Sequence, residues 1–246
     1  GREKELFEKM RKGATPVTSL LPTAAYLEYF EPILAEKDLL FLAFSSQMSA
    51  TINNIFEARE ELLKRYPQRK FIVVDTLSIS YPQTLLILRA HDMYMQGEPM
   101  EAVADWVTNN RLRAHAWLTV DDLVYLKRGG RVSATSAIFG SMLDIKPILT
   151  LTKAGKLEAV GKVQGRKKAL RTIVDRVAEN IEKPEEQEVI ILHGDAEEDA
   201  LLLKDMLTAR IPELAGARPH MIGTVIGSHC GPGTLSCCFM GRERPV

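Results

Sequence analysis

The sequence has no excess of either charge. Its 246 residues include 32 Lys and Arg against 32 Asp and Glu, so the formal net charge is zero. A general nucleic-acid binder needs a basic excess to neutralise phosphates, and a disordered solvating chain combines high net charge with few apolar residues. Here 46% of the residues are hydrophobic. The composition therefore disfavours both classes, and the length is ample for one large or two modest domains.

Long apolar runs and cysteines are also scarce. No apolar run approaches the ~20 residues that span a bilayer, and the charged first residues contain no secretory apolar region. Cys230, Cys237 and Cys238 are an odd, clustered set rather than a disulfide framework. With His229 they fit no standard zinc spacing, so we expect no metal site. We expect a protein of the reducing cytoplasm.

Short apolar runs alternate with helical patterns along the chain, which predicts an α/β fold with two domains. The first domain, residues 1–144, is expected to be a three-layer domain with a mostly parallel sheet built by right-handed crossovers. The second, residues 145–246, is expected to be smaller, with a mixed sheet that includes a hairpin. The expected strands are residues 39–44, 71–75, 115–120, 147–160 as a hairpin, 189–193 and 220–227, and the main expected helices are 23–36, 45–66, 82–96, 99–110, 166–181 and 197–210.

Two hydroxyls follow the first predicted strand. Ligands of parallel sheets usually lie beyond the carboxyl ends of strands, where Ser45-Ser46, Asp75 and Asp121 are expected. The N-terminus of a helix starting at Ser45 would carry free N–H groups and suit an anion. The alternative is that one serine only caps that helix.

A serine hydrolase is a second hypothesis for the same residues. Ser45, then Asp75 or Asp121, then His229 follow the Ser, Asp, His order of α/β-hydrolases. However, the residues around Ser45 lack the glycines of G-x-S-x-G, and no glycine-rich oxyanion loop precedes them. The hydrolase therefore remains the less favoured interpretation.

Two glycine-rich stretches could also carry function. Residues 227–233 place three glycines and a proline around His229, which predicts a rigid turn with exposed N–H groups and a histidine that could donate to an anion. The alternative is a purely structural turn. Residues 127–131 form a basic glycine turn, followed by an expected helix, that could bind phosphate or a partner, although the P-loop pattern is absent. Basic residues at 162–171 form either a docking surface or a solvated helix face.

Seven stretches, in the same order, resemble motifs of the DegV family of bacterial lipid-binding proteins. Thr18-Ser19 resembles the start of the family's T-S-Q-P-S loop, and residues 45–51 resemble S-S-x-L-S-G-T. Residues 74–80 resemble I-D-S-x-x-x-S, and residues 122–133 resemble D-L-x-Y-L-x-x-G-G-R-I-S. The remaining similar stretches are residues 143–149, 162–169 and 226–233.

The resemblance implies two α/β domains with a long-chain fatty acid held between them and no cofactor. The binding protein itself does no chemistry. Some family members present the fatty acid to a separate kinase subunit, which uses ATP to make acyl phosphate for phospholipid synthesis. By position, the residues implied to hold the carboxylate are Thr18, Ser19, Ser45, Ser46 and His229, and those implied for partner docking are Arg131, Lys162 and Arg166.

Several positions depart from the family pattern. Leu20-Leu21 replaces Gln-Pro in the first loop, and Tyr81-Pro82 stands where small residues and glycine are common. Gln164 replaces an arginine, which weakens kinase docking at that position. These changes motivate a third hypothesis, an interaction module without a ligand. The family also opens with a strand that ends in Asp-Ser, and the printed sequence begins after it. Either this segment is missing from the sequence as printed or the protein is a shortened member, and in the second case the first sheet would lack a strand and its edge would need covering.

Overall fold

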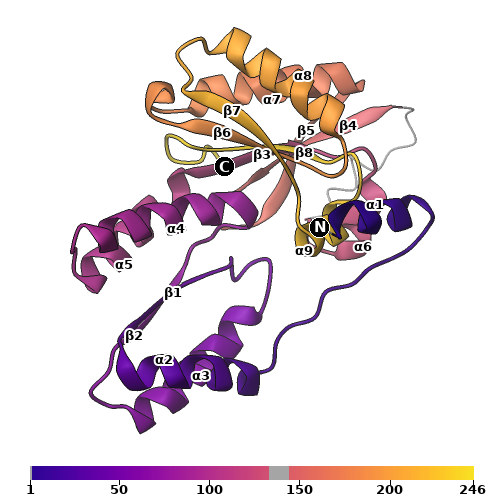
Figure 1. Cartoon of the computed structure of the whole chain (residues 1–246). Helices are drawn as coiled ribbons and strands as arrows, with labels where there is room; N and C mark the ends of the chain where they lie inside the picture. Colours follow the sequence, from indigo (N-terminus) through magenta and orange to yellow (C-terminus); the bar gives the residue numbers. More distant parts are fainter. Residues whose placement is uncertain (1, 133–143) are drawn as a thin grey trace. The chain divides into compact units, whose positions relative to one another are not determined.

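A computed structural model describes residues 2–132 and 144–246 (Figure 1). The chain divides into two compact units. The sheet unit comprises Gly1–Thr18 and Arg113–Val246, and the serine-loop unit comprises Ser19–Leu112. Ser133 and Leu143, which belong to two of the family-like stretches, lie outside the described residues.

The serine-loop unit contains two parallel strands and four helices. Strands β1 (Leu39–Ala43) and β2 (Phe71–Asp75) pair with Leu39 opposite Phe71. Phe30 fixes the packing around them, because its ring lies edge-on at 5.4 Å from Phe41 and 5.2 Å from Phe71. The helices of this unit are α2 (Thr23–Glu36), α3 (Thr51–Arg65), α4 (Ser80–Met95) and α5 (Met100–Asn110), and η1 (Arg111–Arg113) lies at its end.

The sheet unit is built on six strands in the order β5-β4-β3-β8-β6-β7. Only β6 and β7 are parallel; the other paired neighbours are antiparallel, so the sheet is mixed. The strands are β3 (Ala114–Thr119), β4 (Ile145–Leu151), β5 (Leu157–Gln164), β6 (Glu188–His193), β7 (Gly216–Met221) and β8 (Leu235–Met240).

Helices α7 (Arg166–Asn180) and α8 (Glu197–Arg210) cover one face of this sheet (Figure 1). Their apolar residues, including Leu170, Ile173 and Leu203, are fully buried against Trp117 and Phe239 of the strands. The remaining helices of the unit are α1 (Glu3–Arg11), α6 (Leu123–Gly129), α9 (Thr224–Cys230) and the short η2 (Pro184–Glu186). Among the described helices, none combines the length and apolar composition needed to cross a membrane.

The predicted α/β class is confirmed, but the assignment of strands to sheets differs. The strand predicted at residues 115–120 does not join the first, parallel sheet, because β3 pairs antiparallel with β4 and β8. The mixed sheet therefore belongs to the larger unit, and the division of the chain falls after residues 18 and 112, not at 144. All six residues of β3 are buried, and such a strand suits parallel and antiparallel neighbours equally.

The end of the chain also differs from the expectation. The strand predicted at residues 220–227 is wrong, because these residues complete β7 and begin α9. The last strand is β8, which we did not predict. Its cysteines Cys237 and Cys238 are fully buried in the sheet, where they act as small apolar side chains.

Candidate functional site

The serine loop, residues 45–50, connects β1 to α3 through turns. The Ser45 N–H donates to the Ser78 carbonyl at 2.9 Å, and the Ser45 carbonyl accepts from Met48 N–H at 3.0 Å. Helix α3 starts only at Thr51, whose N–H donates to Ser49 Oγ at 3.2 Å. The predicted helix start at Ser45 is therefore wrong, and Ser49 contacts the first turn of the helix.

Asp75 holds the serine loop from the end of β2. Its Oδ1 accepts from Ser46 N–H at 3.3 Å and from Leu77 N–H at 2.9 Å. Leu77 has a φ of +47°, a left-handed conformation that costs energy in a residue with a Cβ. The carboxylate thus fixes both the loop and the strained turn after β2. This is a structural use of Asp75, since the acid of a catalytic triad would instead orient an imidazole.

The two predicted serines differ in exposure. Ser45 is fully buried, and its Oγ accepts from Gln47 N–H at 3.3 Å. Ser46 is half-buried, and its Oγ lies 3.5 Å from Gln47 Nε2, the outer limit of a hydrogen bond. Ser46 is therefore the more accessible hydroxyl of the pair.

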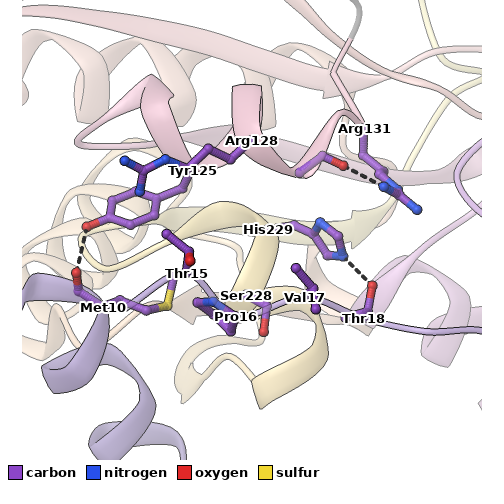
Figure 2. Close-up of a pocket in the computed structure, with 11 residues that line it drawn as sticks. Met10, Thr15, Pro16, Val17, Thr18, Tyr125, Arg128, Arg131, Ser228 and His229 are labelled. Carbon is purple, nitrogen blue, oxygen red and sulfur yellow. Dashed lines mark hydrogen bonds between the residues drawn. The ribbon is translucent and has the colours of Figure 1, made fainter. Parts of the chain in front are cut away.

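The sheet unit contains a cavity of about 430 Å³, which we call the α9 cavity (Figure 2). The end of α1 and the extended segment after it form one wall, and the ends of α6 and α9 form the others. Its lining residues are Met10, Thr15, Pro16, Val17, Thr18, Tyr125, Arg128, Gly129, Arg131, Ser228 and His229.

Thr18 and His229 meet in this cavity although 211 positions separate them. His229 Nε2 lies 2.9 Å from Thr18 Oγ1 (Figure 2). Both residues were predicted to bind the same group, and the fold of the sheet unit brings them together. Burial lowers the pKa of His229, and the neighbouring charge of Arg131 lowers it further. The imidazole is therefore neutral at neutral pH.

His229 lies in a helix, which corrects the turn predicted at residues 227–233. Helix α9 continues to Cys230, and Gly231 ends it with a φ of +80°. The glycines of this stretch are there for packing. A Cβ on Gly227 would lie 2.8 Å from the Phe7 ring of α1, while a Cβ on Gly231 would overlap the Tyr125 ring of α6. The motif thus lets α9 pack closely against both helices.

The basic turn predicted at residues 127–131 lies at the end of helix α6. Lys127 and Arg128 occupy the last turn of α6, where cations suit the helix dipole. Gly130 has a φ of +64° and closes the helix. Arg131 is exposed, and its Nη1 donates to the Gly129 carbonyl at 2.6 Å. The helix expected after this turn falls outside the described residues.

Arg166, predicted as a docking residue, makes hydrogen bonds and ion pairs within the sheet unit. Its side chain is only 19% exposed, its Nε donates to Asp199 Oδ2 at 2.9 Å, and its Nη2 donates to the Gly233 carbonyl at 2.7 Å. Its Nη1 lies 3.5 Å from Asp121, which also pairs with Lys146. Arg166 therefore ties α7 to the turn that precedes β8. It shares Asp121 with Lys146, so this carboxylate too has a structural use.

The other predicted residues are accessible. Lys162 is exposed on edge strand β5, and Ser19 is exposed where the serine-loop unit begins.

All three cysteines are buried free thiols, and burial raises the pKa of Cys230 and Cys238 to about 12. Two residues of the cavity wall, Tyr125 and Met10, were not predicted. In the sequence their apolar side chains are typical of the buried face of a helix.

Comparison with known sequences gives the family. The family model described as "Uncharacterised protein, DegV family" matches residues 2–242. A DegV domain-containing protein of Clostridium perfringens is 39% identical over 242 residues, an overlap of 98% of this chain and 83% of that protein. A DegV domain-containing protein of Streptococcus pyogenes is 32% identical over 239 residues, or 97% of this chain and 82% of that protein.

Solved structures agree with this assignment. A fatty acid binding DegV family protein from Streptococcus agalactiae is 25% identical, with a TM-score of 0.84 over 97% of this chain and 83% of that one. A DegV family protein from Thermus thermophilus, whose structure is described as one of fatty acid binding, is 30% identical, with a TM-score of 0.83 over 97% of this chain and 84% of that one. The motifs, the fold and both comparisons lead to one conclusion: the chain belongs to the DegV family.

Proposed function

We propose that this protein binds a long-chain fatty acid and is a lipid-binding protein rather than an enzyme. The observation that carries the proposal is the pairing of Thr18 with His229 at the α9 cavity. The relatives from Streptococcus agalactiae and Thermus thermophilus, both described as fatty acid binding, support it. In this proposal Thr18, Ser19, Ser45, Ser46 and His229 hold the carboxylate, with His229 acting through its hydrogen bond to Thr18.

The chemistry of these groups suits a carboxylate. A carboxylate accepts up to about four hydrogen bonds, and hydroxyl and imidazole N–H groups are donors. The basic residues Arg128 and Arg131 line the same cavity as Thr18 and His229, and their charge favours an anion. The acyl chain would add about 0.8 kcal/mol for each buried CH₂, which is ample for tight binding of a long chain.

We further propose that the bound fatty acid is presented to a separate ATP-dependent kinase subunit in the cytoplasm, where acyl phosphate is formed. Arg131 supports this role, because it is exposed and lines the cavity that holds His229. Lys162 supplies a second exposed cation for docking. Arg166 would act indirectly, by fixing the loop before β8. Three reduced cysteines suit a reducing compartment.

The test is a fatty-acid titration of delipidated protein that compares Thr18→Val with Thr18→Ser. Valine keeps the shape of threonine but has no hydroxyl, whereas serine keeps the hydroxyl. We expect Thr18→Val to weaken affinity by about 10-fold or more and Thr18→Ser to bind nearly as wild type. Equal affinities for the two variants would reject the head-group assignment, and a wild type that binds no fatty acid would reject the function.

A fluorophosphonate probe separates binding from hydrolysis. A serine hydrolase would be labelled at Ser45 in proportion to the protein present. Because the candidate triad acid Asp75 accepts from the Ser46 and Leu77 N–H groups instead of orienting an imidazole, we expect no labelling. Stoichiometric labelling at Ser45 would replace the binding proposal with the hydrolase.

A further inference from the structure

We propose that Gly129 is a positioning residue that holds His229 as the Nε2–H tautomer, so that His229 donates to Thr18 and the Thr18 hydroxyl is left to donate to the ligand. The inference rests on the proposed function and deepens it. It assigns a direction to the hydrogen bonds of the head-group site.

The ring edge of His229 rests directly on the backbone of α6. A Cβ built on Gly129 would lie 2.6 Å from His229 Nδ1, closer than real Cβ atoms approach a neighbour, and 3.3 Å from Cγ. Any side chain at position 129 would therefore push the imidazole away. The adjacent Gly130 has a different reason to be glycine, namely its positive φ, and a Cβ there would meet no described atom within 4 Å.

The surroundings of Nδ1 decide which ring nitrogen carries the proton. Among the described residues, His229 Nδ1 has no hydrogen-bond partner, and it is buried. An N–H at this position would point at Gly129 without an acceptor, which costs about 1–3 kcal/mol. A lone pair would instead face the Cα–H of Gly129, a weak but favourable contact. The proton therefore belongs on Nε2.

Arg131 helps to keep the ring neutral, so that a single proton is shared between the choices Nδ1 and Nε2. Its guanidinium is fixed on the Gly129 carbonyl, and its positive charge acts on His229. A positive charge near the ring disfavours the doubly protonated imidazolium. The other cationic residue of the cavity wall is Arg128, and no Asp or Glu lines the cavity among the described residues.

The tautomer fixes the polarity of the contact with Thr18. A neutral imidazole with its proton on Nε2 can only donate at Nε2, so Thr18 Oγ1 is the acceptor of the 2.9 Å hydrogen bond. A hydroxyl that accepts still has its own proton to donate. Thr18 can then donate to the carboxylate, and the hydrogen bond from His229 polarises the hydroxyl and strengthens that donation. His229 with Nε2 as a donor cannot also act as a base toward a serine hydroxyl.

The direct test is nitrogen NMR of ¹⁵N-histidine-labelled protein at neutral pH, with His229→Gln used to assign the resonance. We expect a protonated Nε2 and a non-protonated Nδ1 for His229. A protonated Nδ1 with a non-protonated Nε2 would overturn the inference. This arm uses wild-type protein and does not depend on whether a variant folds.

The second arm compares Gly129→Ala with the matched control Gly130→Asn, since asparagine tolerates a positive φ. We expect Gly129→Ala to weaken fatty-acid affinity by about 10-fold or more at unchanged circular dichroism and to shift the His229 nitrogen resonances. Gly130→Asn should leave both near wild type. Wild-type binding by Gly129→Ala would overturn the inference. Failure of the proposed function would differ, because wild-type protein would then bind no fatty acid at all.

Discussion

His115 makes the stability of the sheet unit depend on pH, and the effect can be worked out from its surroundings. The side chain is 1% exposed, its ring stacks on Phe239 at 4.9 Å, and its Nε2 lies 2.7 Å from the Arg242 carbonyl. Burial lowers the pKa of His115 from 6.5 to about 4, and the charge of Arg244 acts in the same direction. The folded chain therefore keeps this imidazole neutral well into acid.

The sign and size follow from proton linkage. Between pH 6.5 and about 4 the unfolded chain binds a proton at His115 and the folded chain does not, so stability rises with pH in this window. The contribution is fully present above pH 6.5 and is lost as the pH falls toward 4. At about 1.4 kcal/mol for each pKa unit, the difference amounts to about 3 kcal/mol.

Urea unfolding at several pH values, followed by Trp117 fluorescence in a Trp106→Phe background, measures this effect. The control is His115→Gln, whose amide can still donate to the Arg242 carbonyl but does not titrate. Other groups titrate in both proteins. The informative quantity is therefore the difference between the two proteins in the slope of unfolding free energy against pH. We expect the unfolding free energy of the parent to fall more steeply from pH about 6.5 to about 4.5. Equal slopes would show that His115 is not held neutral in the folded chain.

Three further predictions concern Asp75, Arg166 and the buried cysteines. Asp75→Asn keeps the Oδ1 acceptor and should retain fatty-acid affinity, whereas Asp75→Leu should lose about 10-fold or more; equal affinities in the same titration would contradict a positioning role for the carboxylate. Arg166→Leu should lower the urea unfolding free energy by about 1–3 kcal/mol, and an unchanged value would return Arg166 to a purely docking role. The three cysteines should react with maleimide only after unfolding, because they are buried and their pKa values are raised; rapid labelling of the native protein would show that the thiols are accessible.

The sequence predicted where the strands lie along the chain better than which strands pair with one another. Short apolar runs identified β1, β2, β3 and β6, because a continuous apolar run of this length is typical of a strand. A continuous apolar run does not indicate which strands will pair with it. Nothing in the six residues of β3 distinguishes the parallel pair β1–β2 from its actual antiparallel neighbours β4 and β8.

The candidate site was predictable only in part. The resemblance to the family selected Thr18 and His229, and the fold of the sheet unit brings them within 2.9 Å. Local patterns misplaced the structure around them, because the glycines of residues 227–233 suggested a turn. Those glycines serve close contacts with Phe7 and Tyr125, residues more than a hundred positions away, which a local pattern cannot reveal.

Charge was the least reliable guide to function. Arg166 belongs to a basic stretch, which suggested a docking surface, yet its guanidinium is bound to Asp199 and to the Gly233 carbonyl. The ion partners of an arginine are set by tertiary structure, so sequence alone does not separate a docking cation from a structural one. Arg131 and Lys162 are the docking candidates that stay exposed.

Mass spectrometry of the lipid released when the purified protein is denatured shows whether this protein binds a long-chain fatty acid. We expect a long-chain fatty acid in stoichiometric amount, and a markedly smaller amount from Thr18→Val protein prepared in the same way. A wild-type protein that releases no fatty acid, and takes up none after incubation with an excess, would contradict fatty-acid binding.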